Sequence, residues 1–177
     1  MVSLRHLEAD YSGLNELPET VLCGSLECLP RGIEKLRDLE TLTEFIVSEE
    51  GADIGELKHL NGLRGKLRIS NIKGVGKEAS HEAILKDKEH LRLLILSFKS
   101  NDDDEAVQSV FELLEPHPNL YKLVILKYNG SKFPSWMEFP NWEGRSIMLC
   151  QLEIHACKNL KVLPEDLNFL KNYIYHN

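Results

Sequence analysis

The stretch "LEIHACKNLKVLPEDLNFL" at Leu152–Leu170 has a near copy in "CGSLECLPRGIEKL" at Cys23–Leu36. Both run Cys, two residues, Leu, two residues, Leu-Pro, two residues, an aliphatic residue, two residues and Leu. A template that recurs along one chain indicates a protein built from stacked repeats. The alternation of Leu152, Ile154 and polar residues just before Cys157 predicts a short strand that buries one face.

The chain carries six strand matches to a leucine-rich repeat, and the last of them is the strand just before Cys157. They are Leu4-Leu7-Ala9, Leu42-Phe45-Val47, Leu63-Leu67-Ile69, Leu91-Leu94-Leu96, Leu120-Leu123-Ile125 and Leu149-Leu152-Ile154. Aligned on positions 7, 45, 67, 94, 123 and 152, the matches are 38, 22, 27, 29 and 29 residues apart. The last four steps agree with the period of roughly 20–29 residues that leucine-rich repeats have.

The first step is irregular. Leu17-Pro18 and Leu29-Pro30 each resemble the end of a leucine ladder, yet they stand only 12 residues apart. The spacing therefore predicts a repeat near residues 18–30 that lacks part of its length, and an irregular N-terminal third.

These observations predict an α/β fold, a leucine-rich-repeat solenoid formed as a single domain over residues 1–177. A curved parallel sheet would form the concave face, with strands near 7–10, 45–48, 66–70, 93–98, 122–127 and 151–155. Helices and loops would form the convex face. Apolar spacing predicts two of those helices, Glu78–Leu91 and Asp104–Leu114. An ordinary amphipathic helix could mimic one repeat, but not a whole series at near-regular steps.

Composition narrows the function. A net charge of −7 argues against a nucleic-acid partner, which would favour a basic surface. Apolar runs are too short for a membrane span, and the N-terminus "MVSLRHLEAD" lacks the apolar core of a secretory signal. Four cysteines without a Cys-x-x-Cys pair suit a reduced, cytoplasmic setting.

No motif supports catalysis or a cofactor. "GVGKEAS" at Gly74–Ser80 lacks the first glycine and the Ser or Thr of a phosphate-binding loop, and "NDDDE" lacks the calcium-loop pattern. His155 should point away from Cys157, so a zinc site with Cys150 is not expected. We expect no enzyme activity and no bound nucleotide, metal or other cofactor. Cys157 is expected to be a packing residue with a weak thiol donor, and Ser12 to take the same place in the first repeat.

Several stretches resemble a known family. They are "LPRGIEKLRDLETLTEFIV", "IGELKHLNGLRGKLRISNIKGV", "AILKDKEHLRLLILSF", "LLEPHPNLYKLVILKYNGSKFPSWM" and "CKNLKVLP". Together they resemble the repeat region of plant disease-resistance proteins of the coiled-coil, nucleotide-binding (NB-ARC), leucine-rich-repeat type, close to the resistance-gene-analogue group. The resemblance runs from about Leu4 to Leu170.

In that family the repeat region helps hold a nucleotide-binding switch domain off and contributes to sensing pathogen effectors or altered host proteins. The resemblance therefore implies an intracellular protein-binding module for defence, whose partner is an effector, a host target or the switch domain of a related receptor. This sequence has no phosphate-binding loop and no switch domain, so nucleotide binding is not implied. A free-standing scaffold or signalling adaptor, a cell-surface ectodomain and a non-functional truncated gene product are the alternatives.

Alternation along the strands predicts the binding surface on the concave face. Its residues are Glu44, Ile46, Lys66, Arg68, Leu93, Ile95, Lys122, Val124, Leu126, Gln151, Glu153 and His155. Among them Leu93, Ile95, Val124 and Leu126 form an apolar patch, which usually marks an interface. The Lys66 and Arg68 row beside it would suit an acidic partner. A strand register shifted by one residue would bury the patch instead. Trp136 and Trp142 are expected in a loop, with Trp136 packed beneath it.

Overall fold

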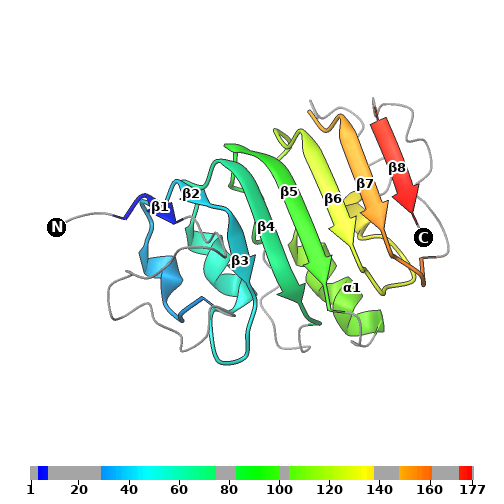
Figure 1. Cartoon of the computed structure of the whole chain (residues 1–177), viewed down its shortest axis with the longest axis horizontal. Helices are drawn as coiled ribbons and strands as arrows, with labels where there is room; N and C mark the ends of the chain where they lie inside the picture. Colours follow the sequence, from blue (N-terminus) through cyan, green and yellow to red (C-terminus); the bar gives the residue numbers. More distant parts are fainter. Residues whose placement is uncertain are drawn as a thin grey trace.

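The computed structural model describes residues 4–7, 29–74, 83–99, 104–137, 148–160 and 172–176. Its main feature is a parallel six-stranded sheet whose strands follow one another in the order of the chain, as Figure 1 shows. The strands are β3 (Glu44–Ile46), β4 (Gly65–Ile72), β5 (Leu91–Phe98), β6 (Lys122–Leu126), β7 (Gln151–His155) and β8 (Asn172–His176). Every strand pair is parallel. Strands added one by one in sequence order are the topology of a solenoid.

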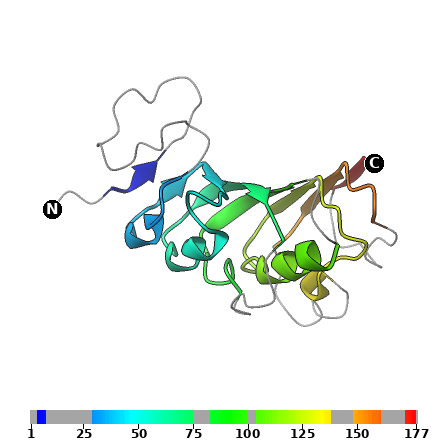
Figure 2. The same ribbon diagram turned by 90° about the horizontal axis from the view of Figure 1, so that it is seen from below.

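The helical segments lie on one face of this sheet. They are the 3₁₀ helices η1 (Ile33–Lys35), η2 (Ile54–His59) and η3 (Ser135–Met137) and the α-helix α1 (Asp104–Leu113). Figure 2 shows the strands along one side of the molecule and α1 and η2 along the other. The structure thus has the α/β leucine-rich-repeat architecture that the sequence predicts.

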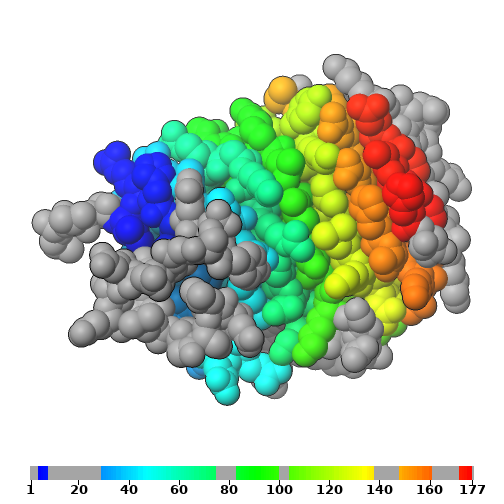
Figure 3. Space-filling model, in the orientation of Figure 1, coloured from blue at the N-terminus to red at the C-terminus, as the bar shows by residue number. Residues whose placement is uncertain are grey.

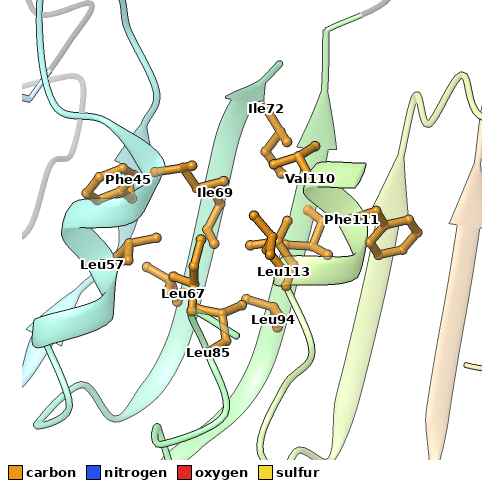
Figure 4. Close-up of a cluster of buried hydrophobic side chains, with 14 of the residues drawn as sticks. Phe45, Leu57, Leu67, Ile69, Ile72, Leu85, Leu94, Val110, Phe111 and Leu113 are labelled. Atoms are coloured by element: carbon orange, nitrogen blue, oxygen red, sulfur yellow. The ribbon is translucent and has the colours of Figure 1, made fainter. Parts of the chain in front are cut away.

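The core lies between the sheet and these helices. Inward residues of neighbouring strands are paired in register, so that Leu67, Leu94, Leu123 and Leu152 form one row with exposed fractions of 0–1%. A second row joins Phe45, Ile69, Leu96, Ile125 and Ile154. Figure 4 shows side chains from β4 and β5 meeting those of η2 and α1. Burial of these apolar rows favours stacking of the repeats, by about 25 cal/mol for each Å² of apolar surface removed from water.

At the carboxyl ends of three strands, β4, β6 and β7, the chain bends and sends one side chain back into the core. Asn71, Lys127 and Ala156 adopt positive φ angles of 57°, 58° and 55°. The residue that follows each of them, Ile72, Tyr128 or Cys157, is fully buried at 0% exposure. Cys157 donates its thiol to the carbonyl of His155 at 3.4 Å, and burial raises the pKa of that thiol. Its expected role as a packing residue with a weak donor is confirmed, while Ser12 lies outside the described residues.

Four aromatic rings form a cluster beneath β5 and β6. Phe111 of α1 makes edge contacts with Phe98, Tyr128 and Trp136 at centroid distances of 5.2, 4.8 and 5.5 Å. Trp136 is 8% exposed and donates its indole N–H to the carbonyl of Phe111. The expectation that Trp136 packs beneath its loop is confirmed; Trp142 lies outside the described residues.

The structure corrects one helix prediction and confirms the other. The helix α1 lies where the segment Asp104–Leu114 predicts it. In the segment Glu78–Leu91, residues 83–90 form turns and bends rather than a helix, and residues 78–82 are outside the described part. Leu85, Lys88 and Leu91 are all buried. A period of three residues is too short for an α-helix, so burial of this row overrides the helix propensity of the residues between.

The first repeat is also placed differently from the sequence alignment. The strand β1 (His6–Leu7) pairs with β2 (Thr41–Leu42) in a separate two-stranded sheet, and Leu7 lies beside Leu42 rather than Phe45. Residues 8–28 are outside the described part, and they include most of the irregular repeat near 18–30 and the end of the strand expected at 7–10.

Candidate protein-binding surface

The face of the six-stranded sheet opposite α1, called the open face below, lies along one side of the molecule in Figure 2. Figure 3 shows the outward side chains of its strands. All twelve residues expected at the binding surface lie in these strands, at positions that alternate with the buried rows. They are Glu44 and Ile46 on β3, Lys66 and Arg68 on β4, Leu93 and Ile95 on β5, Lys122, Val124 and Leu126 on β6, and Gln151, Glu153 and His155 on β7.

Four of these residues form an apolar quartet at the centre of the open face. Ile95 and Val124 are partners in register. Leu93 lies two positions before Ile95 on β5, and Leu126 lies two positions after Val124 on β6. The inward neighbours Leu94 and Ile125 are 0% exposed, so the register is the one that leaves the quartet outside. Leu93, Ile95 and Leu126 are half-buried, whereas Val124 is only 8% exposed. Val124 was expected to be exposed; it is a short side chain flanked by Ile95 and Glu153 in register, and these neighbours cover it.

Charged groups flank the quartet on both sides. On the β3–β4 side, Arg68 Nε lies 3.4 Å from Glu44 Oε1, and the Ser70 hydroxyl donates to the same carboxylate. On the β6–β7 side, Lys122 Nζ donates to Glu153 Oε1 at 2.6 Å. The hydrogen bond from Lys122 is the main reason why the pKa of Glu153 lies below its usual value. The apolar quartet is thus bordered by two ion pairs, in each of which the carboxylate neutralises the charge of the cation.

The strand β8 extends the open face beyond the residues that the sequence indicated. Asn172, Ile174 and His176 continue the rows of Gln151, Glu153 and His155 in register. The rings of His155 and His176 stack at 5.2 Å. In the part of the chain that the structure describes, no group of three or more His, Cys, Asp or Glu side chains is placed to hold a metal ion.

Sequence reasoning missed β8 because tyrosine replaces the aliphatic residues of the strand template. Its inward side chains, Tyr173 and Tyr175, lie beside Leu152 and Ile154 and are partly buried. Burial raises the pKa of Tyr173 to about 12. The alternation in "NYIYH" is the signal that could have revealed this strand.

Two exposed apolar side chains were also missed. Tyr121 is 41% exposed and Met148 is 50% exposed, both just before the strands β6 and β7. Tyr121 occupies the first of the two variable positions between Leu120 and Leu123. Tyr121 and Lys122 both face away from the core. Strict alternation of inward and outward residues assigns only Lys122 to the outer face, and Tyr121 is therefore overlooked.

The described helices include none that is both long and apolar enough to cross a membrane.

Residues 54–175 match the family model described as R13L1/DRL21 LRRs. RGA4 of Solanum bulbocastanum, whose name describes a disease resistance protein, is 36% identical over 164 residues, which are 90% of this chain and 15% of RGA4.

Two further relatives carry similar names. The RPP13-like protein 1 of Arabidopsis thaliana, also named for disease resistance, is 35% identical over 70% of this chain and 13% of its own length. The disease resistance protein RGA2 of Solanum bulbocastanum is 36% identical over 64% of this chain and 11% of its own length. The chain therefore spans a small part of each relative, and that part is a leucine-rich-repeat region related to plant disease resistance proteins. It belongs to the R13L1/DRL21 family of leucine-rich repeats.

Proposed function

We propose that this chain is the protein-binding repeat region of a disease resistance protein that acts in the plant cytoplasm. The observation that carries the proposal is the apolar quartet of Leu93, Ile95, Val124 and Leu126 on a sheet face that no described helix covers. Exposed apolar side chains rimmed by charged groups are typical of a protein interface. No nucleotide, nucleic acid, membrane or metal is part of the proposed activity.

The two flanking ion pairs define how a partner would bind. A partner's apolar side chain over the quartet would remove water from Leu93 and Ile95, while the charged pairs would remain at the rim. Because Arg68 and Lys122 already have carboxylate partners, the rim contributes selectivity more than affinity. The proposed partners are a pathogen effector, a host target of one, or the switch domain of a related receptor, which would make the region part of autoinhibition. The names of the relatives support the role in defence.

The test is the double variant Leu93→Glu with Leu126→Glu. Both side chains are half-buried on the open face, so glutamate should be tolerated there, whereas Val124 is too buried to serve. We expect the variant to lose its partners in affinity purification from plant tissue, with an unchanged circular dichroism spectrum. The partners are identified by mass spectrometry against the unmodified chain.

The matched control places glutamate on the opposite side of the molecule, at Lys35 of η1, which is exposed. Lys35→Glu should retain every partner that the unmodified chain captures. If the double variant keeps its fold and its partners, the open face is not the binding surface. If it unfolds, the quartet is part of the core, and the proposal fails on that ground.

A further inference from the structure

A second group of exposed side chains borders the open face at the amino-terminal ends of β5, β6 and β7. It consists of Arg92, Tyr121 and Met148, called the edge ridge below. Tyr121 and Met148 are 41% and 50% exposed, and Arg92 is exposed as well. These two apolar side chains are more exposed than any member of the quartet, so they retain more area that a partner can bury.

Backbone hydrogen bonds hold the edge ridge together. The N–H of Tyr121 donates to the carbonyl of Arg92 at 2.9 Å, and the N–H of Cys150 donates to the carbonyl of Tyr121 at 2.9 Å. The N–H of Met148 donates to the carbonyl of Pro118, also at 2.9 Å. Hydrogen bonds therefore hold the backbone that carries the three side chains, so little backbone order has to be gained on binding.

The edge ridge is also continuous with the quartet. Arg92 and Tyr121 directly precede Leu93 and Lys122, and Leu93 and Lys122 are partners in register. A segment lying along β5 and β6 could therefore contact the quartet and the edge ridge at once.

Charge indicates what such a segment carries. The guanidinium of Arg92 donates to the carbonyl of Asn119 at 2.8 Å, and in the part of the chain that the structure describes it forms no ion pair. Lys66 of β4 is exposed and likewise has no carboxylate partner among the described residues. These are two uncompensated cations beside the open face of a chain whose net charge is −7. An acidic partner would be attracted to these two cations, whereas the net charge of the whole chain repels it.

We propose that the edge ridge and Lys66 form a selectivity site for an acidic protein segment, in which carboxylates stand beside aliphatic or aromatic side chains. This proposal rests on the proposed function and specifies the chemistry of the partner. Carboxylates of the segment bind Arg92 and Lys66, and its apolar side chains cover Tyr121, Met148 and the quartet. Tyrosine, methionine and arginine are residue types that protein interfaces favour.

The experiment uses the full 177-residue chain and short fluorescein-labelled peptides. One peptide alternates Asp with Leu, a second alternates Lys with Leu, and a third alternates Asp with Ser. Fluorescence anisotropy should show binding of the Asp/Leu peptide, weaker by about tenfold or more for the other two. Because exposed charges are screened by salt, raising the ionic strength should weaken the Asp/Leu complex.

Variants then assign the binding to the edge ridge. Arg92→Glu and Lys66→Glu should each raise the Kd for the Asp/Leu peptide about tenfold, and Tyr121→Ala with Met148→Ala should raise it about fivefold or more. Arg92→Lys keeps the charge and should retain most of the affinity. Matched controls are Lys35→Glu on η1 and Leu4→Ala, whose side chain is 39% exposed before β1. Each variant is compared with the unmodified chain by circular dichroism and thermal melting.

The outcomes separate this proposal from the proposed function. If Lys/Leu and Asp/Leu peptides bind equally well, or if folded Arg92→Glu binds unchanged, the edge ridge is not a selectivity site. Loss of binding in Leu93→Glu with Leu126→Glu would still support the open face in that case. If no peptide binds at all, or if the variants at Arg92, Lys66, Tyr121 and Met148 leave binding unchanged, the acidic-segment proposal is overturned. The affinity purification from plant tissue then tests the proposed function by itself.

Discussion

The ammonium group of Lys88 donates a hydrogen bond to the side-chain amide oxygen of Asn61 at 3.0 Å. Lys88 lies between the buried residues Leu85 and Leu91. Lys88 is 0% exposed. In the two preceding repeats, Leu39 and Leu60 hold the corresponding position and are likewise 0% exposed. The leucine ladder of Leu85, Lys88 and Leu91 therefore contains one buried cation, and this cation donates to Asn61 of the preceding repeat.

Replacing Lys88 with methionine should stabilise the protein at neutral pH. Burial lowers the pKa of Lys88 from 10.5 to about 8, and the nearby Asp87 opposes this shift. The folded state thus disfavours the charged form, and a shift of that size corresponds to at most about 3 kcal/mol. Lys88→Met should raise the free energy of unfolding by about 1–3 kcal/mol, measured by urea denaturation at pH 7.

The pH dependence gives the same prediction a second readout. Between pH 8 and 10.5 the unfolded chain binds more protons at Lys88 than the folded one, so stability should rise with pH in that window. Lys88→Met should abolish this rise. Lys86→Met is the control, because the Lys86 side chain is 59% exposed and its ammonium lies 4.0 Å from Glu115. A rise of equal size in both variants would contradict the prediction.

Trp136 should be more important for stability than an exposed loop residue. Its ring packs on Phe111, and its indole N–H donates to the Phe111 carbonyl at 3.1 Å. Trp136→Phe keeps a ring but leaves that carbonyl without this donor, so it should cost about 1–2 kcal/mol. Trp136→Ala should cost about 3–5 kcal/mol. Equal denaturation midpoints for the unmodified chain and Trp136→Ala would show that the contact does not stabilise the fold.

Gly130 should not tolerate a side chain. A Cβ atom at this position would clash with the Tyr128 hydroxyl oxygen, so the ring or the turn would have to move. The Tyr128 hydroxyl donates to the carbonyl of Lys132 at 2.6 Å, which fixes the ring in place. We expect Gly130→Ala to lower the free energy of unfolding by about 1–3 kcal/mol. A Cβ atom added at Gly65 would have no atom of another part of the chain within 4 Å. Gly65→Ala should therefore cost only the conformational strain of its φ angle of 75°, about 1 kcal/mol.

The two described cysteines should differ in reactivity. Cys157 is 0% exposed and burial raises its pKa, whereas Cys150 is half-buried before β7. Because the thiolate is the reactive form, iodoacetamide should alkylate Cys150 in the native protein well before Cys157. Peptide mapping by mass spectrometry measures both rates in one sample. Alkylation of Cys157 at the rate of Cys150 would show that its turn opens readily.

The ion pair between Lys122 and Glu153 should make a small, pH-dependent contribution to stability. The folded pKa of Glu153 is lowered, chiefly by its hydrogen bond from Lys122, so this contribution is present above the unfolded pKa near 4.5 and is lost as the pH falls below it. The two side chains are 23% and 24% exposed, which limits the pair to about 0.5–1 kcal/mol. A double-mutant cycle with Lys122→Met and Glu153→Gln at pH 7 measures the coupling. A coupling that persists unchanged below pH 3 would contradict the assignment.

Much of the fold can be predicted from leucine spacing because each repeat is a local unit. The buried rows through Leu67, Leu94, Leu123 and Leu152 follow from the strand template together with the repeat period. The prediction failed where the template is broken: tyrosines hide β8, and the row around Lys88 resembles a helix. The N-terminal strand lies three residues away from its expected partner, because Leu4 and Leu7 alone do not specify which later leucine pairs with them.

The sequence by itself determined which residues of each strand face the core, because alternation is a property of one strand and needs no neighbour. It therefore placed all twelve candidate residues on the outward positions. Only the tertiary structure decided how exposed they are, since Val124 is covered by side chains from two other strands. It also decided which charges are free: Arg68 and Lys122 are neutralised within the open face, while Lys66 and Arg92 have no carboxylate partner in the described part. Exposure and charge pairing depend on distances between repeats, and these distances arise only when the repeats stack.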